Sequence, residues 1–569
     1  MTIIKSKVLF PSIFLLLSVY YTLPYLLKYD YWGIRDWDLF TTIAAVPVSS
    51  LLHYGQFPFW NPYLGGGNIL FHHPEVAVLS PFLLLYLIFG AVVGLKLQVL
   101  VCYFLGFWGS HRLATKFGIS KWVALVTTVA YFGSVHFAMH FTEGHTPFTH
   151  FCFLPWFLYF IITSVDRKGD IAMASLVLAL MILGNGAAIP LLYTLTFSAV
   201  LFGLRFVQNR SINELGSLFF SILGGIGLAA VKFVPMVLYM MQIEWKGRAG
   251  ESIPISALWS IFFGLDHSLF IRNFPEQFWR WHEYGSYISP LLVIFAIIAL
   301  LAVFRRRWVW LVIAVFFLLL GLGDFGAYSP WRLLSHLPGF SSARCTGRSF
   351  QFVLLAMSIL GGFGLDWTWQ KVRQFRWPRL SGAILITVAT VIITTNLVMA
   401  WPIMNQAFRH EPKDIQRSPV FGHIIDRVGM TYEYYLANRG SLISNWLSAT
   451  PPSRALVTPD DSVMMENVLT GQADIKHRDY TPNKITYEIE GHSSGEMAIS
   501  MGYDPGWQAT DGRPLREENN LIAFPFEQGH QQVVLRYRPP GLVVGIVISS
   551  LTLVCLVWFR RRRIVTDSD

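Results

Sequence analysis

Charge and cysteine are both scarce in this sequence, and each scarcity excludes a class of protein. Charged residues make up 14% of the chain, well below the roughly 25% of a soluble domain. The four cysteines, Cys102, Cys152, Cys345 and Cys555, are scattered, so their spacing predicts neither a disulfide framework nor a metal site. No stretch resembles a nucleic-acid-binding module. No small-residue cleavage site follows the first apolar run, which we therefore interpret as a membrane helix and not as a removed signal.

Apolar residues dominate instead, at 53% of 569 residues, with a mean hydropathy of +0.46. We conclude that this is an integral membrane protein, because runs of about 20 apolar residues cross the hydrocarbon layer as helices. The net charge of +10 is interpreted as a topology bias and not as affinity for nucleic acid. The apolar runs predict twelve spans, at approximately 8–28, 94–113, 121–138, 149–164, 171–185, 188–206, 216–241, 286–304, 308–322, 349–369, 380–402 and 541–559.

One further apolar run, 76–92, decides the predicted topology. Lys and Arg gather on the cytoplasmic side of membrane helices, and seven basic clusters lie beside the predicted spans. All seven are cytoplasmic only if 76–92 does not cross the membrane. We therefore expect an interfacial or re-entrant segment there, inside a long first outer loop at 29–93. Both termini are then cytoplasmic. The less favoured alternative is that 76–92 spans and the charge bias is accidental.

This topology places the unusual polar stretches outside, among them RDWD, HHPE, HFTEGH, RWHEYGSY and LPGFSSARCTGR. Chemistry is therefore expected on the outer face of the membrane. Nucleotide sugars and ATP are cytoplasmic, which argues against them as substrates. We expect residues 1–402 to form the transmembrane domain.

Residues 403–538 predict an outer domain, because they hold 17 of the 34 acidic residues but only 13 of the 44 basic ones. Apolar positions alternate at 485–490, 496–501 and 533–538, a pattern typical of β-strands. We expect an α/β to β-rich domain, followed at 539–569 by an anchor helix and a basic cytoplasmic tail.

Two carboxylates beside an arginine stand out in the first outer loop, within YWGIRDWDLF (31–40). A carboxylate that reaches a substrate hydroxyl can take its proton as a general base. A helix starting at Leu39 and capped by Asp38 would leave Asp36 facing the site, with Arg35 keeping it ionised. The alternative is that the two aspartates have no catalytic role, with Asp38 capping a helix and Asp36 solvated in a loop. The carboxylates of Asp36 and Asp38 could also bind a divalent cation. No other cofactor is expected.

Two arginines stand out in the last polar stretch, because a guanidinium can bind a phosphate through two hydrogen bonds. Arg344 and Arg348 lie outside, against the positive-inside tendency, which favours an anionic partner over simple headgroup contact. We predict that they bind an anionic group together with His72 and His73. Weaker candidates for substrate binding are Arg35, Glu143, His145, His282 and Glu283.

Four stretches in matching order, YGQFPFWNPYLGGGNIL, EGHTPFTHFCFLPW, LPGFSSARCTGRSFQFVLLAMSILGGFGLDW and YDPGWQATDGR…LRYRPPGLVVG, resemble the YfhO-like bacterial membrane proteins. These proteins are similar to membrane glycosyltransferases of the GT-C class. The resemblance covers nearly the whole chain but departs from the family's pattern at HHPE. It implies a polyprenyl-phosphate sugar as donor, used on the outer face of a bacterial cytoplasmic membrane, with an acidic residue of the first outer loop as the base that takes the acceptor's proton. Arg344, Arg348, His72 and His73 would then bind the donor phosphate, on which negative charge grows as it leaves. The acceptor, a glycan, a lipid or a protein, stays open.

Two other functions remain alternatives. A transporter or flippase of lipid-linked sugars needs ionisable residues in mid-membrane. The predicted spans are poor in such residues, of which Lys232 is the clearest, and this argues against proton-coupled transport. A non-catalytic envelope scaffold would use the outer domain for binding and would tolerate substitution of Asp36 and Asp38.

Overall fold

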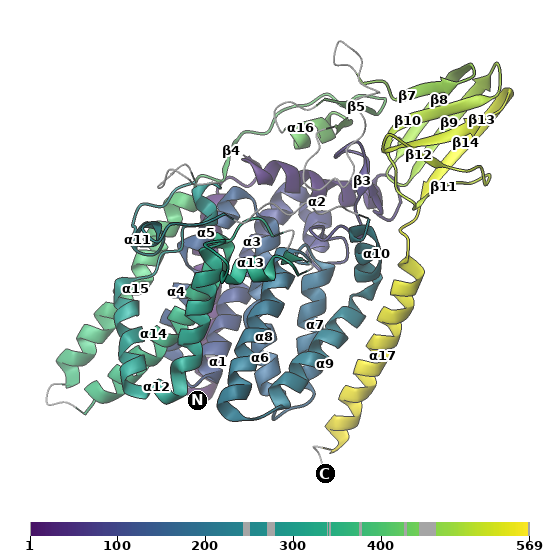
Figure 1. Cartoon of the computed structure of the whole chain (residues 1–569). Coiled ribbons are helices and arrows are strands. Elements are labelled where there is room, and N and C mark those ends of the chain that lie inside the picture. The colour runs from purple at the N-terminus through teal and green to yellow at the C-terminus, as the bar shows by residue number, and fades with distance from the viewer. Residues whose placement is uncertain are drawn as a thin grey trace.

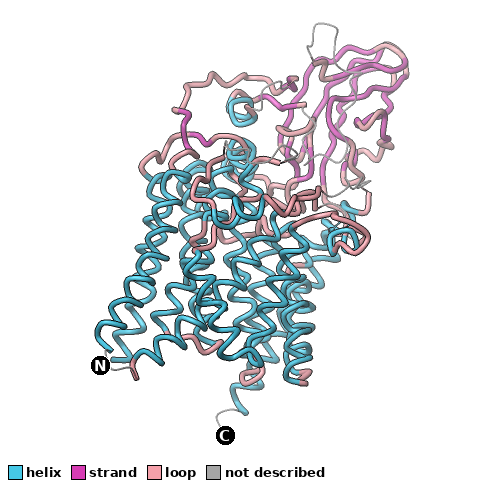
Figure 2. The backbone as a smooth tube through the Cα atoms, turned by 60° about the vertical axis from the view of Figure 1, so that its left-hand side comes forward, coloured by secondary structure: helices cyan, strands magenta, loops and turns pink. Residues whose placement is uncertain are grey.

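The computed structural model joins a bundle of long helices to a strand-rich unit at one end (Figure 1). Both termini lie at the opposite end of the bundle, and the strands are confined to the strand-rich end (Figure 2). We call these the termini end and the strand end. The structure describes residues 2–242, 251–269, 279–337, 339–340, 343–374, 378–425, 430–442 and 463–566. Parts of the predicted outer loop 242–285 and of the segment 403–480 fall outside these ranges.

The helices account for most of the described chain. Their bounds are α1 Thr2–Leu26, α2 Asp36–Leu52, α3 Leu83–Lys116, α4 Lys121–Phe132, α5 Val135–Glu143, α6 Phe153–Thr163, α7 Asp170–Leu183, α8 Ile189–Asn209, α9 Asn213–Leu228, α10 Ala230–Met240, α11 Ala257–Phe263, α12 Pro290–Gly321, α13 Pro330–Leu334, α14 Phe350–Val372, α15 Pro378–Met404, α16 Thr431–Leu436 and α17 Leu542–Thr566. The described residues also form three 3-10 helices, η1 Thr146–Cys152, η2 Trp281–Glu283 and η4 Gly347–Ser349.

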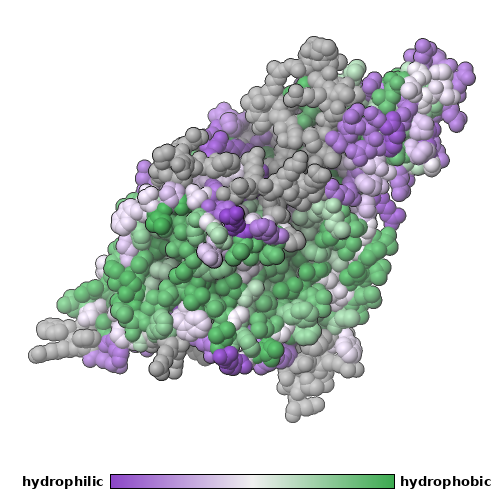
Figure 3. Space-filling model, in the orientation of Figure 1, coloured by the Kyte–Doolittle hydropathy of each residue, from purple (hydrophilic) through white to green (hydrophobic). Residues whose placement is uncertain are grey.

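Six of the described helices are long and apolar enough to cross a membrane, or eight if each of two bent pairs is one span. The bent pairs are α4 with α5, at 40°, and α9 with α10, at 86°. Apolar surface forms a band over the helical part between more polar ends (Figure 3). These features agree with a polytopic membrane protein, while the number of twelve spans stays a prediction.

The stretch 76–92 does not form a helix of its own. Residues 76–82 are irregular, and α3 begins at Leu83 and breaks at Gly90, whose φ is 77°. Seven helical residues before that break extend only about 10 Å, too short to span. Leu84 and Ile88 on this turn are 60% and 70% exposed, as expected for side chains facing lipid. The geometry therefore agrees with the interfacial interpretation.

Two spans were expected here, at 286–304 and 308–322. The structure gives them as α12, with apolar parts at Pro290–Ala302 and Arg307–Gly321. The backbone N–H of Ile288 donates to Phe262, at the end of α11, while the carbonyl of Leu322 accepts from Ile253, just before α11. Both ends of α12 thus lie beside the same short helix, at the strand end. The two apolar parts of α12 therefore run in opposite directions.

Basic turns gather at the termini end. Phe10 of α1 packs against Trp122 of α4, with ring centroids 5.2 Å apart. Lys116 pairs with Asp166 at 3.3 Å, and the Arg205 guanidinium lies 5.7 Å from the Phe117 ring. The turns after α3, α6 and α8 therefore share one face with the N-terminus. That arrangement suits a cytoplasmic termini end, which stays a prediction.

Two four-stranded antiparallel sheets make up the strand-rich unit, in the orders β12-β13-β10-β7 and β11-β14-β9-β8. Their strands are β7 Glu466–Thr470, β8 Ala473–Thr481, β9 Lys484–Gly491, β10 Gly495–Gly502, β11 Trp507–Ala509, β12 Arg516–Glu518, β13 Leu521–Phe526 and β14 Gly529–Tyr537. Ile485, Tyr487 and Ile489 are fully buried in β9. The strands expected from alternation at 485–490, 496–501 and 533–538 are confirmed.

The strand-rich unit packs on the first outer loop, through short strands of that loop. Met501 Sδ accepts from the Trp60 indole at 3.2 Å, and Trp60 also contacts the rings of Trp507 and Tyr537. His423 links the two through Pro62 and Ser500. The short strands pair as β2 Trp60–Asn61 with β3 Asn68–Ile69, β1 Trp32–Gly33 with β4 Phe408–His410, and β5 Gly422–Ile424 with β6 Arg439–Ser441.

Candidate functional site

Four segments far apart in sequence meet at the strand end of the bundle. They are the start of α2, the end of α5 with the following turn, η2, and η4. Together they contribute the charged and imidazole side chains of Arg35, Asp36, His140, Glu143, His145, His282, Glu283 and Arg348. We call this set the polar cluster. Seven of its eight members were site candidates from the sequence, so the structure brings most of them together.

Two glycines allow this close approach. A Cβ on Gly144 would lie 2.2 Å from the backbone nitrogen of Trp37, and Gly144 has φ of 99°, which favours glycine. A Cβ on Gly347 would lie 2.4 Å from the carbonyl oxygen of Glu283. The turn after α5 therefore touches the start of α2, and η4 touches η2, only because both residues lack a side chain.

A chain of polar contacts runs from Asp36 inward. His145 Nε2 lies 3.3 Å from Asp36 Oδ2, and the Nδ1 atoms of His145 and His140 are 2.7 Å apart. On its other side, His140 Nε2 lies 3.9 Å from Glu283 Oε2. The Asp36 side chain is 36% exposed, whereas His140 and Glu283 are buried. The chain thus connects an accessible carboxylate to a buried one.

Both glutamates of the polar cluster are paired with arginines. Arg348 donates to Glu283 through Nε at 2.8 Å and through Nη2 at 2.5 Å, the strong two-bond geometry of this ion pair. Arg35 Nη1 donates to Glu143 Oε2 at 2.6 Å. His282 lies between the glutamates, 3.6 Å from Glu143 and 3.7 Å from Glu283.

These contacts set the charge states. Burial alone would raise the pKa of Asp36, but the hydrogen bond and charge of His145 outweigh it and lower the pKa. Burial would lower the pKa of His145, yet the bond to Asp36 and the charge of Glu283 raise it. For Glu283 the opposing effect of burial is overcome by Arg348, which holds the pKa well below its usual range. Asp36 and Glu283 are therefore ionised at neutral pH.

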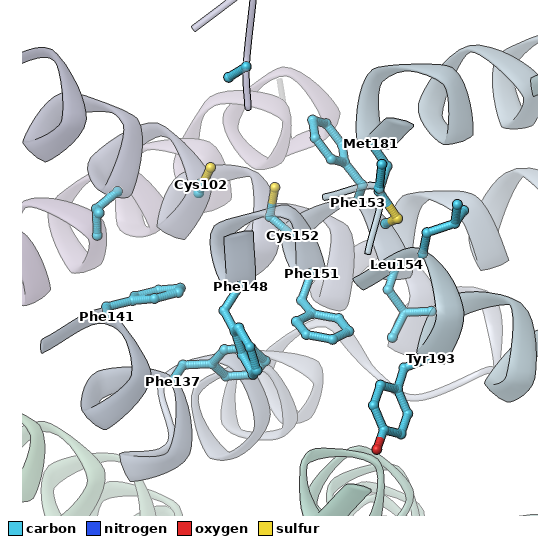
Figure 4. Close-up of a cluster of buried hydrophobic side chains, with 14 of the residues drawn as sticks. Cys102, Phe137, Phe141, Phe148, Phe151, Cys152, Phe153, Leu154, Met181 and Tyr193 are labelled. Carbon is cyan, nitrogen blue, oxygen red and sulfur yellow. The ribbon is translucent and has the colours of Figure 1, made fainter. Parts of the chain in front are cut away.

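An aromatic layer supports the buried side of the polar cluster. The rings of Phe137, Phe141, Phe148 and Phe151 gather there (Figure 4). Phe148 stacks on His140, with centroids 3.9 Å apart and planes 17° apart, and the Arg348 guanidinium lies 5.4 Å from the same ring. The Phe148 ring thereby fixes the orientation of the His140 imidazole.

Asp38 lies in a different environment from Asp36, and the expectation that it caps a helix starting at Leu39 is wrong. Helix α2 already begins at Asp36. Asp38 accepts from the backbone nitrogens of Thr431 and Tyr432, at 2.7 and 3.1 Å, and from the Thr431 hydroxyl at 2.6 Å. It therefore caps α16, in the outer segment. Residues two apart on a helix do not share a face, so the carboxylates of Asp36 and Asp38 do not converge on one ion.

The four predicted phosphate contacts are spread over three places. Arg348 is bound to Glu283, whereas Arg344 is exposed, 5.6 Å from the Trp279 ring. His72 and His73 are buried, and His72 packs against Tyr239, with ring centroids 5.8 Å apart. Burial and the nearby Lys232 charge lower the pKa of both histidines to about 3, so they are neutral.

Sequence analysis missed two residues here. His140 stands one turn before Glu143 in HFTEGH, and the spacing of His136, His140 and Glu143 on one helical face was an available signal. Glu75, in HHPE, is buried beside a small cavity that Thr146 and Asn185 also line. Burial raises its pKa to about 8, and no sequence pattern indicated that.

One part of the polar cluster has the composition of a metal site. One ligand atom from each of His140, His145 and Glu283 lies within 4.8 Å of the others. Among the described residues this is the single group of three or more His, Cys, Asp or Glu that meets that distance.

Several solved structures are similar to this chain at low identity. Arabinofuranosyltransferase AftD from Mycobacteria has 14% identity and a TM-score of 0.45, over 69% of this chain and 27% of AftD. The apo oligosaccharyltransferase of Archaeoglobus fulgidus has 11% identity and a TM-score of 0.44, over 79% of this chain and 66% of that one. ArnT from Cupriavidus metallidurans, bound to undecaprenyl phosphate, has 10% identity and a TM-score of 0.42, over 92% and 98%.

The chain thus spans about a quarter of the length of AftD and about two thirds of that of the oligosaccharyltransferase. No curated protein matches it. A family model described as "Bacterial membrane protein YfhO" matches residues 452–549, which agrees with the resemblance seen in the sequence.

Proposed function

We propose that this protein transfers a sugar from a polyprenyl-phosphate donor to an acceptor hydroxyl on the outer face of the membrane. The acceptor oxygen attacks the anomeric carbon as the bond from that carbon to the phosphate oxygen breaks. Polyprenyl phosphate leaves with the electron pair of that bond. The proton of the acceptor passes to the carboxylate of Asp36.

The observation that carries this proposal is the partly exposed Asp36 carboxylate, 3.3 Å from His145 at the strand end of the bundle. A general base must reach the proton that it removes, and its pKa matters only after that. Asp36 starts α2, where the first-turn amides also favour a negative charge. It is therefore both accessible and ionised.

Glu75 is a weaker candidate for the base. Its pKa of about 8 leaves it mainly protonated at pH 7, and its side chain is buried. A protonated carboxyl donates a hydrogen bond and takes no proton. We assign Glu75 to the inner wall of the site, where it can hold a hydroxyl of a bound sugar.

The donor phosphate needs positive charge. Arg348 and Arg35 are already committed to Glu283 and Glu143, so we assign them to positioning these glutamates. Arg344 is exposed at the same end of the bundle and precedes η4. Its guanidinium suits a phosphate at the entrance to the site.

Lys232 bears on the transporter alternative. Its ammonium donates to the backbone carbonyls of Val76 and Gly184, at 2.7 and 2.5 Å. Those bonds tie the irregular stretch 76–82 to α10 and to the end of α7. They give Lys232 a structural role that does not require transport of an ion.

The test uses purified protein in lipid nanodiscs with a panel of polyprenyl-phosphate sugars and short glycan acceptors. We expect one donor to be consumed, with release of polyprenyl phosphate detected by mass spectrometry, and Asp36→Asn to abolish that release. In sealed proteoliposomes, movement of intact donor across the bilayer without consumption would instead identify a flippase. A protein that binds donor but neither consumes nor moves it would contradict both activities.

A further inference from the structure

We propose that Arg35 is a positioning residue for Asp36. Its backbone holds a strained turn that directs the Asp36 carboxylate to His145, and its ion pair with Glu143 stabilises that turn. The strained turn is independent of the proposed function. Its effect on sugar transfer rests on that function.

The strain lies in the backbone of Arg35. Its φ of 56° and ψ of −124° are close to the first central position of a type II′ turn, at about +60° and −120°, where glycine is preferred. The turn is closed, because the Trp37 N–H donates to the Ile34 carbonyl at 3.2 Å. Arg210, the other described arginine with a positive φ, has a ψ of 23° and lies in the ordinary left-handed region. Arg35 therefore has a conformation that a Cβ atom disfavours.

Both sides of the turn are attached to distant segments. The N–H of Ile34 donates to the carbonyl of Ala407 at 2.9 Å. The indole of Trp37, which is buried, donates to the carbonyl of Phe141 at 3.0 Å. The residues between these two anchors, Arg35 and Asp36, are the ones that a change of turn type would move.

A relaxed alternative exists for this segment. A type I turn, which most residues adopt without strain, also joins the carbonyl of its first residue to the N–H of its fourth. It would keep the bond between Ile34 and Trp37. It differs in the orientation of the peptide units on either side of Arg35, so the Asp36 carboxylate would turn away from His145.

The ion pair with Glu143 opposes that relaxation. The Arg35 guanidinium donates to Glu143 at 2.6 Å, and the two side chains are only 16% and 7% exposed. A charge-assisted bond in such a site is stronger than a solvated surface pair. Glu143 directly precedes Gly144, where the end of α5 touches the backbone of Trp37. The pair therefore holds the turn at the point where it meets α5.

The choice of arginine at this position is itself evidence. Glycine would form the same turn without strain, but it would lose the ion pair with Glu143. Strained residues persist where the surrounding structure holds them, and they gather at active sites. The strained residue here directly precedes the proposed base, Asp36.

The experiment compares Arg35→Gly with Arg35→Ala, which both lack the guanidinium and differ by one methyl group. At an unstrained position alanine is the more stable choice, because glycine has more freedom in the unfolded chain. At a strained turn the order reverses, so we expect Arg35→Gly to unfold at the higher temperature. Thermal unfolding of the full-length protein in detergent measures this without a substrate. A more stable Arg35→Ala would overturn the strained turn.

A second substitution reports the direction of the Asp36 side chain. Where the carboxylate contacts His145, Asp36→Asn should lower the unfolding temperature. We expect that loss in wild type and in Arg35→Gly, and a much smaller loss in Arg35→Ala, where the contact is already broken. Equal losses in the three backgrounds would overturn the positioning role.

Turnover completes the test, with the polyprenyl-phosphate sugar that the nanodisc panel shows to be consumed. Arg35→Gly should exceed Arg35→Ala by roughly tenfold, the ratio that backbone strain of this kind sets. Arg210→Gly and Arg210→Ala are the matched control, because Arg210 also has a positive φ but lies at the termini end. These two variants should have equal turnover.

The two measurements separate the inference from the proposed function. If the unfolding temperatures are as expected but no donor is consumed, the strained turn stands and the proposed function fails. If Asp36→Asn abolishes transfer while Arg35→Gly and Arg35→Ala transfer sugar equally, the proposed function stands and the positioning role fails.

Discussion

Asp38 accepts hydrogen bonds from both the backbone N–H and the hydroxyl of Thr431, a residue 393 positions away in the chain. Asp36, two residues before it, points instead to His145. The two carboxylates of one short motif therefore have separate tasks. Asp38 attaches the outer segment to α2, and Asp36 faces the polar cluster.

The first prediction separates these tasks. Asp36→Asn keeps the shape but removes the basic oxygen, so donor turnover should fall by about a hundredfold or more. Asp38→Ala should leave turnover within a few fold but destabilise the outer segment by about 2 kcal/mol, because two backbone amides lose a charged acceptor. Turnover assays and proteolysis of the outer segment measure the two effects. A dead Asp38→Ala with an unaltered proteolysis pattern would reverse the assignment.

The second prediction concerns the two arginines of LPGFSSARCTGR. Arg344→Ala should raise the donor concentration needed for half-maximal turnover by roughly tenfold, with little change in thermal stability, because the side chain is exposed. Arg348→Ala should lower the melting temperature, because Glu283 would be left buried without its counter-ion, at a cost of about 3 kcal/mol or more. If Arg348→Ala changes only donor affinity, our assignment of the positioning role is wrong.

The third prediction tests the close approach at Gly144. A methyl group there would meet the backbone of Trp37 at 2.2 Å, on a residue whose φ is 99°. Gly144→Ala should push the start of α2 away from His145 and reduce turnover by at least tenfold. Gly169→Ala is the matched control, since nothing lies within 4 Å of a Cβ at Gly169. Equal activity in the two variants would show that the approach is not needed.

The fourth prediction is a pH dependence of the contact between the outer loop and the strand-rich unit. Burial lowers the pKa of His423 to about 4, so the folded state favours the neutral ring, whose nitrogens lie 3.1 Å from the Pro62 carbonyl and from the Ser500 hydroxyl. The unfolded chain, with a pKa near 6.5, binds the proton more readily. Stability is therefore unaffected above pH 6.5 and is lost between pH 6.5 and pH 4, by about 3 kcal/mol.

Thermal unfolding of wild type and His423→Gln from pH 7.5 to pH 4.5 measures this. Glutamine keeps a donor and an acceptor but does not titrate, so the stability difference between wild type and variant should change below pH 6.5. A constant difference over this range would contradict the role of His423.

The fifth prediction concerns topology. In a Cys555→Ser background, Ser120→Cys at the termini end should be unreachable by an impermeant thiol reagent added outside, and Glu517→Cys on the strand-rich unit should react. Both positions are exposed, so a lack of labelling would not be caused by burial of the thiol. Thr146 would be unsuitable, because it is 2% exposed. The opposite labelling would place the polar cluster on the cytoplasmic side. It would then exclude a lipid-linked donor that binds at the outer face of the membrane.

Several features were determined by the sequence because they depend on neighbours along the chain. Period-two alternation gave the strands around Tyr487, and the basic turns indicated which loops lie together. The motifs at 35–38, 143–145, 282–283 and 344–348 predicted most of the polar cluster. In a membrane protein, polar side chains are few and costly, so their positions in the sequence already point to a site.

Only the tertiary structure decided how those residues are paired. The roles of Asp36 and Asp38 differ because helix geometry turns them to opposite sides and because Thr431 happens to lie beside one of them. Arg348 and Arg344, four residues apart, differ because Glu283 reaches only the first. His140 joins the polar cluster through the bend after α5 at Gly144. Such contacts form between backbone segments that are hundreds of residues apart in the chain. The local sequence therefore does not determine which distant residue a side chain will contact.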